Sequence, residues 1–178
     1  MKKNSILFSA LLLIAVVSFV ACSKDNDDTT TLNVRMTDNP IDLDSVFVHV
    51  LQVRVKMGND TAADASDNGW VDLQTNAGIY NLLRLQNGID TALATGIVPT
   101  GMLKEIRFVL GTNNSVVDTF GVRHPLTIPS GSESGLKIKV NRKLNSTLQT
   151  VLMDFDAALS IQKESTGYKL RPVIKVKN

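Results

Sequence analysis

The sequence predicts an all-β protein made of two packed sheets. Short segments alternate apolar with polar residues, and Asn, Asp, Gly and Pro separate them. Helical periodicity is sustained nowhere beyond a turn or two at Asp156 to Gln162. Many short strands with such punctuation are typical of a two-sheet sandwich rather than a parallel α/β sheet. We therefore expect a β-sandwich of about seven to nine strands.

The strand pattern recurs along the whole folded part of the chain. It occurs at Leu32–Met36, Ser45–Met57, Gly69–Leu73, Leu103–Leu110, Gly135–Val140, Leu148–Phe155 and Tyr168–Val176. In the first segment, Leu32, Val34 and Met36 alternate with polar residues, as in a strand with one buried face. The last segment contains Pro172, which cannot donate a ladder hydrogen bond. This strand is therefore expected at a sheet edge or with a bulge.

The segment Ser45–Met57 contains a change of phase. Its early apolar residues are Val46, Val48 and Val50, and its late ones are Val53, Val55 and Met57, one position out of step. A β-bulge near Leu51-Gln52 would restore a single buried face. Alternatively, the first half of the strand is covered on both sides.

The first 21 residues resemble an export signal. Met1 to Lys3 is a short basic region, Ile6 to Val20 is an almost uninterrupted apolar run, and Ala21 is the small residue needed before a cleavage site. The apolar run is shorter than the roughly 20 residues of a spanning helix. We expect residues 1–21 to be removed as a lipoprotein signal peptide.

Cys22 is the only cysteine, and it follows that signal directly. Phe19-Val20-Ala21-Cys22 resembles a bacterial lipobox, which implies acylation of Cys22 and membrane anchoring through lipid. The alternatives are ordinary secretion or an inert cysteine. The acidic residues 23–28 are similar to the export signal of Bacteroidetes surface lipoproteins, which implies the outer membrane and a surface-exposed position, although an acidic segment also keeps a linker solvated. We expect residues 22–30 to be a flexible tether and 31–178 a single domain.

Charge is balanced overall but uneven along the chain. Removing Lys2 and Lys3 from the 19 basic residues leaves 17, equal to the 17 acidic ones, which does not support nucleic-acid binding. Residues 22–100 hold 5 basic and 11 acidic side chains, whereas residues 101–178 hold 12 and 6. If strands of the two halves interleave, cross-strand pairing would neutralise this difference.

Four motifs occur along the folded part of the chain. They are Thr37-Asp38-Asn39-Pro40 (TDxP), Pro129 to Lys137 (PSGxxSGLK), Asp154 to Ala157 (DFDA) and Leu170 to Ile174 (LxPVI). Together they resemble an uncharacterised family of lipid-anchored bacterial domains of unknown function. The resemblance covers residues 31–177 and implies a Greek-key β-sandwich like transthyretin or immunoglobulin domains. It implies no activity and no catalytic residues.

Two groups of residues are candidate ligand sites. Asp38, Asp154 and Asp156, together with Asp42 and Asp44, carry the oxygen ligands that Ca²⁺ prefers, and loops at one end of a sandwich could gather them. The alternative is that they stabilise turns. Ser130, Ser132 and Ser134 lie in a glycine-containing turn that could bind an anion through backbone amides, or could be only a tight connection between strands.

Catalytic patterns are scarce. Neither His49 nor His124 has a metal-ligand neighbour at close spacing, and no nucleotide-binding or cofactor motif occurs. Trp70, Tyr80 and Tyr168 fit packing better than a sugar platform. We expect a non-enzymatic, surface-exposed binding or accessory module that contacts a glycan or an envelope protein. The alternatives are a structural, adhesin-like subunit that assembles through edge strands such as Tyr168–Val176 and, least favoured, a hydrolase.

Overall fold

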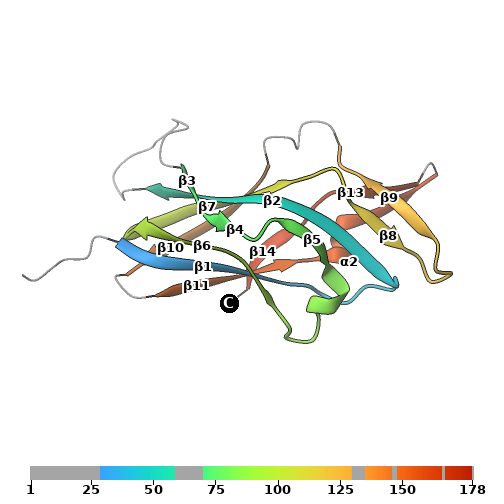
Figure 1. Ribbon diagram of the computed structural model, residues 1–178, viewed down its shortest axis with the longest axis horizontal. Coiled ribbons are helices and arrows are strands. Elements are labelled where there is room, and N and C mark those ends of the chain that lie inside the picture. The colour runs from blue at the N-terminus through green and yellow to red at the C-terminus, as the bar shows by residue number, and fades with distance from the viewer. Residues whose placement is uncertain (1–28, 59–69, 130–134, 146–147, 166, 178) are drawn as a thin grey trace, which may run out of the picture.

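Two open mixed sheets make up nearly all of the structure, a computed structural model that describes residues 29–58, 70–129, 135–145, 148–165 and 167–177. In spatial order, the five-stranded sheet consists of β14 (Ile174–Lys177), β11 (Gln149–Phe155), β1 (Thr29–Thr37), β6 (Thr91–Pro99) and β4 (Gln74–Thr75). Its members pair antiparallel, except that β1 and β11 are parallel. Figure 1 shows β1, β6 and β11 running along the long axis of the molecule.

The second sheet has nine strands. Its spatial order is β10 (Leu136–Leu144), β7 (Gly101–Leu110), β2 (Ser45–Gly58), β8 (Ser115–Val117), β9 (Arg123–Thr127), β13 (Gly167–Leu170) and β12 (Ile161–Glu164), and both β3 (Trp70–Asp72) and β5 (Gly78–Asn81) also pair with β2. The described residues thus contain fourteen strands, more than the seven to nine expected, because several have only two to four residues. The only helices among them are the single turns η1 (Leu82–Leu85) and α2 (Ala157–Ser160), so the prediction of a mostly β fold is confirmed.

Alternation of apolar residues places one face of each long strand in the core. Leu32, Val34 and Met36 of β1 are fully buried, as predicted. In β2, all five valines from Val46 to Val55 are fully buried, although their spacing changes in the middle. The pairing of β2 with β7 shifts register between Val50 and Gln52, which confirms the predicted bulge. Residues of both sheets contribute to one hydrophobic core.

The expected continuous strand Tyr168–Val176 is wrong, because its two halves belong to different sheets. β13 pairs with β12 and β9, whereas β14 pairs with β11. Residues 171–173 connect them and bond to the segment around α2: Arg171 N–H donates to Ser160 O at 2.8 Å, and Val173 N–H donates to Ser160 Oγ at 2.8 Å. Pro172 has no N–H to donate, so no sheet hydrogen bond from this residue is lost where β13 and β14 separate. The predicted edge position is confirmed for β14.

The described residues include no helix that is both long and apolar enough to cross a membrane.

Candidate functional site

The structure brings together three of the aspartates that the sequence suggested as calcium ligands. Parallel pairing of β1 with β11 aligns Thr37 with Asp154, so the ends of these strands meet. Asn39 Nδ2 donates to Asp154 Oδ2 at 2.9 Å and to Asp156 Oδ2 at 3.4 Å. Asp38 Oδ1 accepts from the Ala157 N–H at 2.9 Å. We call Asp38, Asn39, Asp154 and Asp156 the aspartate cluster; its three carboxylates are buried.

Burial has the largest effect on the ionisation of Asp38, one member of this cluster. Desolvation raises the pKa of Asp38 to about 6, backbone hydrogen bonds from Ala157 and Asn39 oppose the rise, and the Asp154 carboxylate adds to it slightly. Asp154 Oδ1 is buried without a hydrogen-bond partner in the described structure. The nearest compensating cation is Lys175, whose Nζ lies 3.6 Å from Asp156 Oδ2. Within the cluster, burial therefore disfavours the charged form of Asp38.

The contacts of the cluster are those of a structural junction. Asp156 is the N-cap of α2, since its Oδ1 accepts from the Leu159 N–H at 3.0 Å. Asp42 and Asp44 are exposed and do not take part in these bonds. Among the described residues, no three His, Cys, Asp or Glu side chains are grouped so that they could hold a metal ion. The calcium site therefore stays a prediction.

The last two residues of the expected tether, Thr29 and Thr30, belong to β1 and pair with β6. Four other predicted residues lie outside the described part of the chain: Ser130, Ser132 and Ser134 of the serine turn, and the lipidation residue Cys22. Their roles remain predictions.

The two histidines have separate surroundings. His124 Nε2 lies 2.8 Å from Asp118 Oδ2, and this hydrogen bond lowers the pKa of Asp118. The His124 ring also packs against Tyr168, at 5.1 Å between centroids. His49 is held in β2 by its own N–H, which donates to Asn114 Oδ1 at 2.8 Å. These contacts connect β9 to β13 and hold β2 to the residue that precedes β8.

A cationic groove, which the sequence reasoning missed, lies between β10 and β14. Its volume is about 1010 Å³. Each of these strands ends the spatial order of its sheet, so the groove runs between two open strand edges. Its lining comprises six basic residues (Lys137, Lys139, Arg142, Lys143, Lys175 and Lys177), Asn141, and four apolar ones (Ile138, Val140, Ile174 and Val176). None of the described lining residues is acidic or aromatic.

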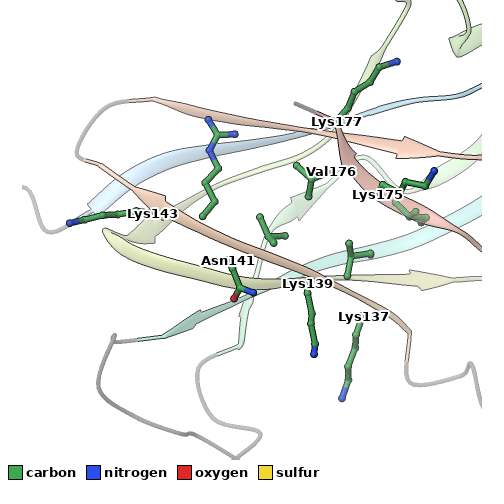
Figure 2. Close-up of a pocket in the computed structure, with 11 residues that line it drawn as sticks. Lys137, Lys139, Asn141, Lys143, Lys175, Val176 and Lys177 are labelled. Atoms are coloured by element: carbon green, nitrogen blue, oxygen red, sulfur yellow. The ribbon is translucent and has the colours of Figure 1, made fainter.

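Strand periodicity explains how the groove combines charge with an apolar floor. In β14, Ile174 and Val176 are half-buried while Lys175 and Lys177 are exposed. Figure 2 shows Lys137 and Lys139 extending from one side of β10, Lys177 extending in the opposite direction, and Val176 between the two strands. The ammonium groups are therefore spread along the groove and do not converge on one point.

A bulge interrupts β10 where this strand lines the groove. The pairing of β10 with β7 shifts between Lys139 and Arg142, and Asn141 has φ 49°, in the left-handed region. Beyond this bulge, Arg142 Nη1 donates to Thr150 O of β11 at 3.2 Å, which ties the edge of one sheet to the other. This bond connects β10 to β11, the neighbour of β14 in the five-stranded sheet.

Most of the groove cations are without counter-charges. Lys175 is paired with Asp156, but no ion pair within the described residues includes Lys137, Lys139, Lys143 or Lys177. Lys139 is opposite Glu105 in the β10–β7 register without forming an ion pair. At this edge, cross-strand pairing therefore does not neutralise the excess positive charge of residues 101–178. The segments LKIKV and IKVK show alternating lysines in the sequence, but they do not show that the two strands lie beside each other.

Residues 29–172 match the model of a family described as a domain of unknown function, DUF4382. The chain belongs to the DUF4382 family. This confirms the predicted resemblance to a domain of unknown function. No curated protein and no solved structure matches the chain.

The DUF4382 match includes all of the aspartate cluster but only part of the cationic groove. It includes the whole aspartate cluster, and the TDxP and DFDA motifs are the segments that meet there. It also includes β10 but ends at residue 172, before β14 begins at Ile174. Only one wall of the cationic groove is therefore part of the DUF4382 match.

Proposed function

We propose that this DUF4382 protein is a non-enzymatic binding module and that its cationic groove binds an extended anionic ligand. The lining of the groove contains six basic and no acidic residues, and of the six only Lys175 forms an ion pair within the described structure. Clustered like charge raises the local concentration of oppositely charged ligands and speeds their association. This observation carries the proposal.

The shape of the groove favours a long ligand over a single small anion. Lys177 and the Lys137–Lys139 pair point away from each other across the groove (Figure 2), so one phosphate or carboxylate cannot contact them all. A polymer with repeated negative charges can contact these groups in turn. Each added pair would contribute modestly, since exposed ion pairs are worth about 0.2–1 kcal/mol.

We also propose that the protein acts at the cell envelope. The signal sequence and the lipobox-like Phe19 to Cys22 support a lipid anchor on Cys22, with surface exposure favoured by the acidic tether. A sandwich arrangement of the two sheets is supported by their shared hydrophobic core. Greek-key connectivity like that of transthyretin or immunoglobulin domains is part of this proposal and rests on the sequence resemblance.

Binding of defined polyanions tests the proposed function. The chain from residue 22 onward, made soluble by Cys22→Ser, would be titrated with polyglutamate, a sulfated polysaccharide and inorganic phosphate. We expect the two polymers to bind, with affinity falling as salt increases because screening weakens exposed charge interactions. Phosphate alone should bind much more weakly.

A matched pair of charge reversals locates the binding. Lys177→Glu reverses a charge in the groove. Lys163→Glu makes the same change on β12, which is at the end of the nine-stranded sheet opposite to the groove strand β10. We expect Lys177→Glu to weaken polyanion binding about tenfold, equivalent to ~1.4 kcal/mol, and Lys163→Glu to have little effect. Equal losses in both variants would mean that only net charge matters, and would reject the groove as the site.

A further inference from the structure

The groove offers backbone hydrogen-bonding groups as well as charge. Within the described parts of the chain, β14 pairs only with β11, and β10 pairs only with β7. An open edge presents a row of N–H and C=O groups that can accept an added strand. A ligand with its own extended backbone could therefore use interactions that a purely ionic ligand cannot.

The alternation in β14 defines what such a strand should contain. Lys175 and Lys177 are on one face, and Ile174 and Val176 are on the other. An added strand that alternates acidic and apolar residues would place its carboxylates beside the lysines and its apolar side chains beside Ile174 and Val176. Opposite charges and apolar pairs across neighbouring strands each contribute roughly 0.2–1 kcal/mol.

The same lysines disfavour a second copy of this chain. Pairing β14 with β14 of another copy would bring Lys175 and Lys177 next to like charges, and lysine on an edge strand is a common protection against such pairing. Assembly of identical subunits through this edge is therefore disfavoured, and the edge is selective for an acidic partner.

The groove also lacks the features that recognise sugar rings. None of the described lining residues is aromatic, and Asn141 is the single amide among them. Sugar recognition usually combines an aromatic face with several polar groups. Between an acidic polypeptide and an anionic polysaccharide, the groove favours the polypeptide.

We infer that an acidic, extended polypeptide segment of a partner protein binds by adding as a strand to the free edge of β14. This inference rests on the proposed function and adds the class of ligand and the mode of binding. In this arrangement Lys175 and Lys177 of β14 lie beside the carboxylates of the added strand.

Peptides with the same charge but different backbones separate strand addition from general anion binding. The first probe is an eight-residue peptide of alternating Glu and Val, and the second is a block isomer with four Glu followed by four Val. Two further peptides carry N-methyl groups on alternate residues, one on the Glu positions and one on the Val positions. N-methylation removes the N–H donors on one edge of an extended peptide and keeps its charge.

We expect the alternating peptide to bind at least tenfold more tightly than the block isomer. One of the two N-methylated peptides should lose this advantage, because one edge of the added strand must face β14. Amide NMR signals of residues 174–177 should shift on binding. Lys177→Glu should abolish the preference, whereas Lys163→Glu should retain it.

The outcomes distinguish this inference from the proposed function. If polyglutamate and all four peptides bind similarly and depend on Lys177, the groove binds anions but strand addition is wrong. If the sulfated polysaccharide binds much more tightly than every peptide, the ligand class is wrong. If no polyanion binds in a Lys177-dependent manner, the proposed function fails as well.

Discussion

Lys175 Nζ lies 3.6 Å from Asp156 Oδ2, and this pair connects the cationic groove to the aspartate cluster. Lys175 is exposed on β14, whereas Asp156 is buried at the start of α2. Asn39, which follows the end of β1, donates a hydrogen bond to the same carboxylate. Lys175 thus lines the cationic groove and also lies beside the buried carboxylate of Asp156.

The Lys175–Asp156 pair should make a small, measurable contribution to folding. We expect a double-mutant cycle of Lys175→Gln and Asp156→Asn to give a coupling free energy of about 0.3–1 kcal/mol, since the lysine is more than half exposed and water screens the pair. Urea denaturation of the four proteins measures it. Additive effects of the two substitutions would show that the pair contributes nothing.

Loss of the Asp156 side chain should cost much more than loss of its charge. Asp156→Ala removes the N-cap bond to Leu159 and the bond from Asn39, and we expect a loss of about 2 kcal/mol in the free energy of unfolding. Asp156→Asn keeps a capping oxygen and should lose less. Asp42→Ala, at an exposed position, is the control and should stay within about 0.5 kcal/mol of the native protein. Equal losses for Asp156→Ala and Asp42→Ala would contradict the capping role.

Stability should fall as pH rises through the range in which Asp38 ionises. Its folded pKa is about 6, above the usual 3.8, so between these values the folded protein holds more protons than the unfolded chain. The stabilising effect of the protonated form is fully present below pH 3.8 and is lost as pH rises to about 6.

Asp38→Asn should remove this pH dependence. The amide oxygen can still accept from the Ala157 N–H, but no charge is buried. We expect the variant to match the native protein near pH 4 and to be more stable by about 1–2 kcal/mol at pH 7. Denaturation curves from pH 4 to pH 8, with Asp42→Asn as the control, measure the difference. A variant less stable than the native protein at pH 7 would mean that hydrogen bonding to the carboxylate outweighs its desolvation.

Gly111 should not tolerate a side chain, because His49 occupies the space beside it. A Cβ at position 111 would lie 2.7 Å from His49 Cε1 and closer still to Nδ1. We expect Gly111→Ala to destabilise the protein by about 1–3 kcal/mol, the usual cost of overpacking. Gly78→Ala is the matched control, since no atom lies within 4 Å of the added Cβ and φ is not positive. A thermal midpoint for Gly111→Ala equal to that of Gly78→Ala would show that the His49 ring moves aside freely.

Local patterns were sufficient to predict some strands and not others. The alternation in Leu32 to Met36 and the change of phase at Leu51-Gln52 predicted a buried face and a bulge, because side-chain period is a property of the strand itself. β6 was not predicted, since its sequence TALATGIVP carries Ala, Gly and Thr where an alternating pattern would need large apolar residues. β6 is held in place by pairing with β1 and β4, and β1 is far from it in the sequence.

By itself, the sequence determined the β class, the candidate aspartates and the uneven distribution of charge. Tertiary structure decided that residues 168–177 divide between two sheets and that β10 and β14 become neighbouring edges. In the interior of a sheet, the same lysines would have strands on both sides and counter-charges across them. Strand order depends on contacts between residues far apart in the chain, so no local pattern could reveal that these cations would line an open groove.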